Sequence, residues 1–324
     1  MQQRAGGAGL ALAILSAATF GTSGTFAASL LDAGWSPGAA VTARITVAAL
    51  VLTVPAVVAL RGRWSLLLRS AKTIAAYGLV AVAGCQLFYF NAVAHLSVGV
   101  ALLLEYLGTI VVVGWLWMRH GQRPRRLTVI GGVIAILGLV LILDLAGAHR
   151  LDPIGVLWGL GAAFGLAVYF VLSAHADEPA PPLVVAWGGM SIGAVALIVL
   201  GAIGILPMRA PLTDVTLIHH RVSWLVPLLG LSLVAAVIAY VAGIAAARRL
   251  GAKLASFVGL TEVVCAVLFA WLLLGQVPAA VQFAGGALIV LGVVFVRLDE
   301  LRTPSAPSHD QEGIRTAFRA EIPS

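Results

Sequence analysis

The sequence predicts an all-α membrane protein in which ten transmembrane helices form two inverted five-helix repeats. Composition is the first reason: 61% of the 324 residues are hydrophobic and only 10% are charged, whereas about a quarter of a soluble chain is charged. The second is a series of apolar stretches, most of them near the ~20 residues that cross a ~30 Å hydrocarbon core. The third is a glycine-rich pattern that recurs after 154 residues.

The apolar stretches are expected to be helices, because in lipid a helix satisfies its own backbone and no period-2 alternation suggests a barrel. The first stretch follows Arg4 and stays apolar far beyond the 7–15 residues of a signal-peptide core, so we interpret it as a retained span. The ten expected spans are residues 9–31, 38–60, 73–94, 97–118, 126–143, 154–174, 183–206, 222–247, 253–275 and 278–296.

The distribution of Lys and Arg predicts the orientation. If the N-terminus is cytoplasmic, 16 of these residues lie in cytoplasmic segments and three outside, at Arg150, Arg209 and Arg221. The positive-inside rule therefore predicts a multi-pass plasma-membrane protein with both termini in the cytoplasm. The net charge of +7 does not indicate nucleic-acid binding, because the arginines lie between apolar blocks and not on a polar face.

Residues 299–324 differ from the rest of the chain. They contain three prolines, five of the 13 acids and few large apolar side chains. Such a segment cannot bury enough apolar area to fold, so we expect a disordered cytoplasmic tail.

The internal repeat is seen when the chain is shifted against itself by 154 residues. The matched residues are Trp117, Gly121, Gln122, Pro124, Gly131, Gly132 and Gly138 with Trp271, Gly275, Gln276, Pro278, Gly285, Gly286 and Gly292. Earlier segments match at a shift of 144, which places ten extra residues in the loop around 207–221. The repeats are expected at 9–143 and 154–296. Because five is odd, the second repeat is inverted, as in many secondary transporters.

Three charged residues lie well inside the expected spans. Glu105 and Glu262 are the acids, and Arg44 is the one basic residue well inside a span. A charged group costs several kcal/mol in hydrocarbon unless it is paired or hydrated, so function is the default hypothesis. A carboxylate is expected to contact a cationic amine or to exchange a proton. The alternative is a protonated or Arg-paired glutamate that only holds helices together.

Arg44 has three interpretations: it binds a substrate carboxylate, it pairs with Glu105, or it extends to the headgroups. Other polar residues in the spans are candidates for the substrate cavity, although each also fits packing or an interhelical hydrogen bond. They are Thr22, Gln86, Tyr89, Tyr169 and Tyr240. The two cysteines, Cys85 and Cys265, are interpreted as small buried hydrophobic residues.

Several motifs are absent from the sequence. It contains no G-x-x-x-x-G-K-[ST] phosphate loop, no H-E-x-x-H, and no His/Asp or Cys/His cluster in a span. We therefore expect no ATP hydrolysis, no metal, no cofactor and no enzymatic activity. A membrane-embedded enzyme and a non-transporting membrane subunit are the alternatives.

The chain resembles the EamA family of the drug/metabolite transporter superfamily, closest to its amino-acid and metabolite exporter branch. The resemblance rests on Arg-Arg-Leu-Gly-Ala-Lys-Leu-Ala-Ser at 248–256, Glu262, Trp-Leu-Leu-Leu-Gly at 271–275, Gly285, Gly286 and Gly292, Val-Ala-Leu-Leu-Leu-Glu-Tyr-Leu-Gly at 100–108, and Arg44. Departures are Val263 and Thr109, where relatives often have proline, and Gln276, where an acid is common.

The resemblance implies ten helices, cytoplasmic termini and transport of small metabolites through a central cavity without ATP hydrolysis. Together with the two carboxylates inside the spans, it predicts a secondary transporter that moves an amino acid or a related metabolite, in the direction of export, by alternating access.

Overall fold

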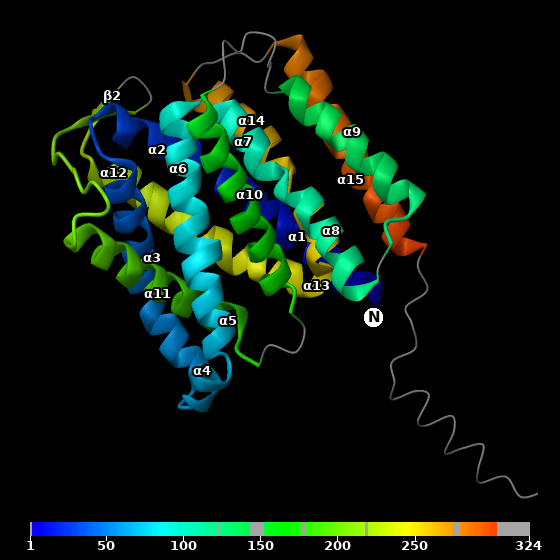
Figure 1. The fold of residues 1–324 in the computed structure, drawn as a ribbon, viewed down its shortest axis with the longest axis horizontal. Helices are drawn as coiled ribbons and strands as arrows, with labels where there is room; N and C mark the ends of the chain where they lie inside the picture. Colours follow the sequence, from blue (N-terminus) through cyan, green and yellow to red (C-terminus); the bar gives the residue numbers. More distant parts are fainter. Residues whose placement is uncertain are drawn as a thin grey trace, which may run out of the picture.

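The computed structural model describes residues 2–96, 98–121, 123–142, 152–175, 179–217, 220–274 and 279–302, and most of them are helical (Figure 1). The tail from residue 303 onward lies outside the described residues, as do Gln122, Gly275, Gln276 and Pro278 of the repeated pattern.

The first repeat contains α1 (Gln2–Gly21), α2 (Ser23–Asp32), α3 (Pro37–Leu60), α4 (Ser65–Arg69), α5 (Ala71–Ala76), the π-helix η1 (Tyr77–Gly84), α6 (Cys85–His95), α7 (Val98–Tyr106), α8 (Gly108–His120) and α9 (Arg126–Ile142). The second contains α10 (Pro153–Ser173), α11 (Pro182–Ala202), the antiparallel strands β1 (Val215–Leu217) and β2 (His220–Val222), α12 (Leu225–Leu229), the π-helix η3 (Gly230–Ile238), α13 (Ala239–Gly259), α14 (Thr261–Leu274) and α15 (Ala280–Leu301).

Six helical stretches in the described residues are long and apolar enough to cross a membrane, and a shorter apolar helix covers Arg126–Leu141. The six are Gly7–Asp32, Pro37–Leu60, Ala71–His95, Pro153–Ser173, Pro182–Ala202 and Leu225–Gly259. The expected fourth and ninth spans are each built from two shorter helices, α7 with α8 and the end of α13 with α14. The predicted all-α membrane architecture is confirmed.

The boundary of the last helix differs from the expected one. α15 continues to Leu301, and Asp299 is only 3% exposed although the sequence placed it in the tail. The Thr128 hydroxyl donates to Asp299 Oδ2 over 2.6 Å, and Lys253 Nζ lies 3.9 Å from the same oxygen. These polar contacts explain why an acidic residue continues the helix, and they join α9 and α15 to α13.

Local signals in the sequence account for several helix ends. Ser36 caps α3, because its hydroxyl accepts from the Ala39 amide while Pro37 occupies the first turn. Gly251 bends α13 sharply with a φ of 78°, a left-handed conformation that costs glycine little. This bend ends the eighth span and begins the ninth.

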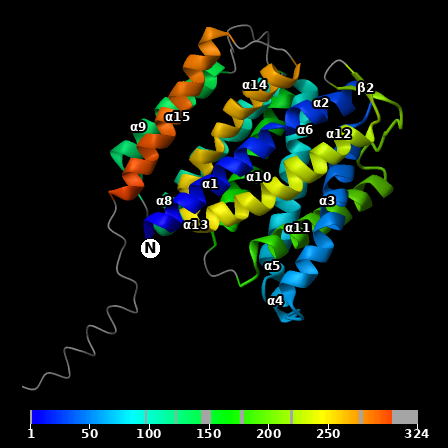
Figure 2. The ribbon, with the colours of Figure 1, turned by 180° about the vertical axis from the view of Figure 1, so that it is seen from behind.

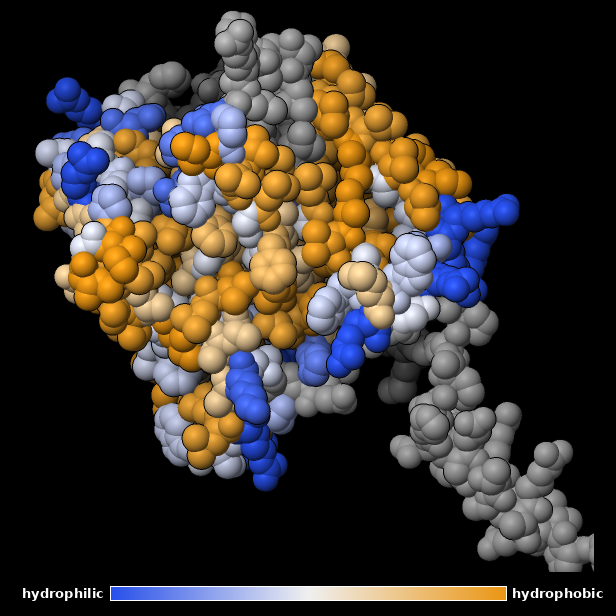
Figure 3. Space-filling model, in the orientation of Figure 1, coloured by the Kyte–Doolittle hydropathy of each residue, from blue (hydrophilic) through white to orange (hydrophobic). Residues whose placement is uncertain are grey.

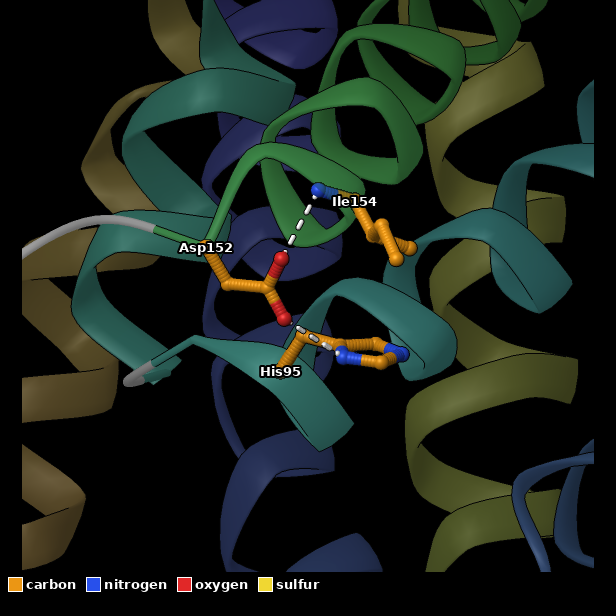
Figure 4. A network of polar contacts seen from close by, with 3 residues as sticks. All are labelled: His95, Asp152 and Ile154. Atoms are coloured by element: carbon orange, nitrogen blue, oxygen red, sulfur yellow. Dashed lines mark hydrogen bonds and ion pairs between the residues drawn. The ribbon is translucent and has the colours of Figure 1, made fainter.

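Asp152 caps α10 and joins it to the end of α6 (Figure 4). Its Oδ1 accepts from the Ile154 amide over 2.9 Å, and its Oδ2 lies 2.9 Å from His95 Nδ1. The amide bond first, and then His95, lower the pKa of Asp152. The stabilisation from this cap is therefore fully present above the pKa of an unfolded aspartate and is lost as the pH falls through the lowered value.

Three spans contain a one-residue interruption. At Thr22, Leu107 and Leu260 the backbone forms i→i−3 bonds, such as Leu107 N–H to Leu104 O and Leu260 N–H to Phe257 O. The interruptions at Leu107 and Leu260 agree to within one residue at the repeat shift of 154. Short 3₁₀ turns inside a helix often mark hinges.

The π-helices also obey the repeat. η1 corresponds, after the shift of 154, to residues 231–238, and η3 covers Gly230–Ile238. η1 packs against α11 so closely that a Cβ on Gly78 would lie 2.5 Å from the Gly189 carbonyl oxygen. η3 packs in the equivalent way against α3. π-helical segments are rare, and many occur at functional sites.

The two repeats interlock in the bundle. α1 packs along α13 and α14, whereas α10 packs against α6, α7 and α8, so the first helix of each repeat contacts mainly the other repeat (Figures 1 and 2). Apolar residues cover a broad area of the face in Figure 3, and hydrophilic residues gather at its margins. This surface is suited to lipid.

Helices α9 and α15 form a closely packed pair on one flank of the bundle (Figures 1 and 2). A Cβ on Gly131 would lie 2.7 Å from the Gly292 carbonyl oxygen, and one on Gly138 would lie 2.6 Å from that of Gly285. The repeat aligns Gly131 with Gly285 and Gly138 with Gly292. The contacts therefore exchange the aligned partners, which is the pattern of a two-fold axis between the helices.

We expect Gly131→Ala to destabilise the protein by about 1–3 kcal/mol, because the methyl group meets backbone atoms that cannot move independently. Gly114→Ala is the control, since a Cβ there meets no atom within 4 Å. Thermal unfolding of the purified protein measures both. Equal stability of the two variants would show that close contact of α9 with α15 is not needed.

Candidate functional site

A cavity lies at the contact between the repeats. Its volume, counted as room for the centres of water molecules, is about 90 Å³, whereas a single water needs ~10–15 Å³ on this measure. The first repeat contributes walls from α1, α2, η1, α6 and α7, and the second from α10, α13 and α14. The interrupted helices bring their ends to this cavity, where exposed backbone groups are tolerated because they do not face lipid.

Both intramembrane carboxyl groups line the cavity. Glu105 is 8% exposed and lies two residues before the interruption at Leu107, while Glu262 lies two residues after that at Leu260. The Cys85 thiol donates to Glu105 Oε1 at 3.5 Å, and the Tyr106 hydroxyl lies within hydrogen-bonding reach of the Glu262 carboxyl group. Each acid therefore has a neutral donor as neighbour.

Arg44 is 1% exposed and forms a network beside the cavity. Its Nη1 donates to Gln86 Oε1 over 2.6 Å and to Ser23 Oγ over 3.3 Å, and its Nη2 donates to the Ala235 carbonyl of η3. The guanidinium group thus joins α3 to α2, α6 and η3. Neither Glu105 nor Glu262 lies within ion-pair distance of it, although all three side chains are described.

Aromatic rings form much of the remaining wall. Tyr169 and Tyr240 have ring centroids 5.6 Å apart, and Phe20 lies 5.0 Å from Tyr240, with both pairs in edge-to-face arrangements. Tyr77 packs behind them, 5.9 Å from Tyr169. A Cβ on Gly243 would overlap the Tyr169 hydroxyl, so the Tyr169 side chain can occupy this position only because residue 243 is glycine.

The structure brings most of the predicted site residues together. Six of the predicted residues line the cavity: Glu105, Glu262, Gln86, Tyr89, Tyr169 and Tyr240. Thr22 does not, because its hydroxyl donates to the Thr19 carbonyl one turn earlier, while the neighbouring Gly21, Ser23 and Gly24 reach the wall. Arg44 contacts the lining residues Gln86 and Ser23 without lining the cavity itself, and it does not extend toward the headgroups.

Sequence reasoning missed three residues of the site. Cys85 was taken for an inert apolar residue, whereas its thiol contacts Glu105. Tyr106 immediately follows Glu105 in the chain but faces Glu262. Ser16 lines the cavity and donates to the Ala239 carbonyl over 2.8 Å. No signal in the sequence marked these residues, because each depends on which helices meet.

The chemistry of the lining suits binding and proton exchange. No group of three or more His, Cys, Asp or Glu that could hold a metal ion occurs among the described residues. The arrangement provides carboxyl groups, hydroxyl groups and aromatic rings around one small cavity.

Comparisons with known proteins agree with this architecture. A model of the EamA-like transporter family matches the chain twice, over residues 7–144 and 153–298. An uncharacterised transporter of Archaeoglobus fulgidus is 25% identical over 227 residues, which are 70% of this chain and 75% of that protein. A protein of known crystal structure has the same fold, with a TM-score of 0.73 and 22% identity over 91% of this chain and 99% of its own. The family resemblance seen in the sequence is confirmed.

The hydrogen bonds of Arg44 predict how substitutions of Gln86 change the stability of the protein. Gln86→Ala leaves a buried guanidinium group without one of its three acceptors, so we expect the free energy of unfolding to fall by about 1–3 kcal/mol. Gln86→Glu keeps an acceptor and adds opposite charge, so it should unfold at a higher temperature than Gln86→Ala. Asn91→Ala is the control, since the Asn91 amide donates to the Leu87 carbonyl of its own helix. Equal losses for Gln86→Ala and Asn91→Ala would contradict a special role of the network.

Proposed function

The chain belongs to the EamA-like transporter family, and from this premise we propose that it is a secondary transporter that moves a small metabolite across the plasma membrane. The cavity between the repeats is the proposed substrate site. The observation that carries this proposal is the position of Glu105 and Glu262, which line one cavity next to equivalent interruptions of the fourth and ninth spans. Discontinuous helices near the midplane are the usual components of such sites.

Alternating access is the proposed mechanism. Its support is the inverted repeat, because two related units of opposite orientation can exchange roles and open the same site to either side. The interruptions at Leu107 and Leu260 and the equivalent π-helices η1 and η3 are positions where spans can bend. The matched glycines make the contact between α9 and α15 two-fold symmetric. This helix pair can therefore keep the same contact when the site opens to either side of the membrane.

The proposed substrate is an amine-bearing metabolite, and the proposed direction is export. The amine follows from the two carboxyl groups, and the metabolite class and the direction follow from the family resemblance. The volume of about 90 Å³ suits a small solute.

Glu105 is the proposed coupling residue. Its carboxyl group has a thiol neighbour and no cationic partner within ion-pair distance among the described residues, so a proton or a substrate ammonium group can compensate its charge. A cavity that opens to each side in turn lets this group exchange with either compartment. Binding of the amine and binding of the proton then compete for one carboxylate.

Glu105→Gln keeps the shape of the side chain and fixes it as neutral. We expect this variant to insert and fold normally but to lose uptake of amine substrates into vesicles, or the pH dependence of that uptake. Glu262→Gln should have a milder effect, because Tyr106 already occupies the neighbourhood of that carboxyl group.

Asp214→Asn is the matched control, since Asp214 is an exposed acid before β1 and is far from the interrupted spans in sequence. Wild-type rates and an unchanged pH profile in Glu105→Gln would show that Glu105 has no part in coupling.

The proposed cytoplasmic termini can be tested with single cysteines at exposed positions, in a variant whose Cys85 and Cys265 are serine. Thr216→Cys in β1 should react with a membrane-impermeant thiol reagent in intact cells. Ser65→Cys, at the start of α4, should react only after permeabilisation. The reverse pattern would overturn the orientation derived from the arginines.

A further inference from the structure

The polar groups of the cavity wall are strongly biased toward one charge. Among the described residues the lining contains two acids, Glu105 and Glu262, and no lysine, arginine or histidine. Neither acid takes part in an ion pair with a described residue, since the two ion pairs found are His95–Asp152 and Lys253–Asp299. A positive group on the bound solute would therefore be the first direct counter-ion of these carboxyl groups.

Arg44 is the nearest candidate for recognition of a substrate carboxylate, and its contacts argue against that role. Three of its hydrogen bonds go to Gln86, Ser23 and the Ala235 carbonyl, so Nη1 and Nη2 are both engaged with the protein. The side chain is 1% exposed and does not line the cavity. A carboxylate in the cavity would meet the two acids without a cationic side chain at the wall, and like charges at short distance repel.

Aromatic side chains supply the second feature of the wall. Six of the lining residues are aromatic: Phe20, Tyr89, Tyr106, Tyr169, Phe170 and Tyr240. The faces of such rings attract ammonium groups, and cages of aromatic rings recognise quaternary and substituted ammonium ions. Four of these rings pack edge to face in a continuous row, Phe20 on Tyr240, Tyr240 on Tyr169 and Tyr169 on Phe170. These contacts hold the rings in place at the wall before a solute binds.

On the basis of the proposed transport function, we propose that the substrate is a compact organic cation, a protonated amine or a quaternary ammonium ion, and that a carboxylate on the solute is not required and weakens its binding. Glu105 and Glu262 face the ammonium group, and the aromatic wall covers its alkyl substituents. Arg44 is a positioning residue that holds Gln86, and it does not contact the solute.

The direct test compares three probes on purified full-length protein by isothermal titration: isobutylamine, valine and tetramethylammonium. Isobutylamine and valine have the same side chain and amine and differ by the carboxyl group. We expect isobutylamine and tetramethylammonium to bind, and valine to bind about tenfold to a hundredfold more weakly, because its carboxylate has no partner. Binding of valine as tightly as isobutylamine, or no binding of either amine, would overturn the proposed selectivity.

Variants of Glu105 and Tyr240 test separately whether the carboxyl groups and the aromatic rings of the wall contribute to binding. Glu105→Gln should weaken isobutylamine binding by about tenfold or more, whereas Asp214→Asn should leave it unchanged. Tyr240→Phe keeps the ring and should keep tetramethylammonium binding, while Tyr240→Leu should lower it by about threefold to tenfold. Equal affinities in Tyr240→Phe and Tyr240→Leu would remove the aromatic wall from recognition.

A counterflow assay in proteoliposomes separates this inference from the transport function. Exchange of isobutylamine supports both the transport function and the proposed cation selectivity. Tight amine binding without exchange would refute transport and leave a cation-binding site. Exchange of valine in preference to isobutylamine would refute the cation selectivity and leave transport intact.

Discussion

Lipid offers no hydrogen bonds to a polypeptide, and the structure depends on how the chain meets this constraint. Regular helices satisfy their own backbone wherever they face lipid, and the spans depart from regular geometry at Thr22, Leu107 and Leu260 and in η1 and η3. The interruptions at Leu107 and Leu260 border the cavity, and η3 gives the Ala235 carbonyl to Arg44. Irregular backbone is therefore found where protein groups can compensate it, and these are the positions that can bend.

The helix packing follows the pseudo-symmetry of the repeats, whereas the charged residues of the site do not. The two-fold contact between α9 and α15 is formed at four repeated glycines, Gly131, Gly138, Gly285 and Gly292. The charged residues have no charged equivalents: Glu105 aligns with Gly259 and Glu262 with Gly108. Those glycines are packed tightly, since a Cβ on Gly108 would lie 2.5 Å from the Ala163 carbonyl oxygen and one on Gly259 would lie 3.0 Å from Phe170. A side chain is excluded at Gly108 by the Ala163 backbone, and one at Gly259 would displace the Phe170 ring. The two carboxyl groups therefore have no symmetric counterparts and lie in one cavity.

The sequence was sufficient for features that depend on composition, period and repetition. It predicted the helical spans, the two inverted repeats and the two intramembrane acids, because each leaves a local or periodic signal. It did not predict the interruptions at Leu107 and Leu260, because the adjoining Gly108 and Gly259 do not stand out in a chain of 36 glycines. It also did not predict the contacts of Cys85 and Tyr106 with the acids. Those contacts depend on which helices meet. The sequence also could not show that Thr22 lies off the cavity wall, with its hydroxyl bonded to the Thr19 carbonyl.

In the proposed transport cycle, the cavity around Glu105 is reached from both sides of the membrane in turn. Cys85 is a native reporter, because it lines the cavity and is one of two cysteines in the chain. In a Cys265→Ser variant in proteoliposomes of defined orientation, the rate at which a small, charged methanethiosulfonate modifies Cys85 can be measured from each side separately. The account predicts modification from either side. Modification from one side only, or from neither, would contradict it.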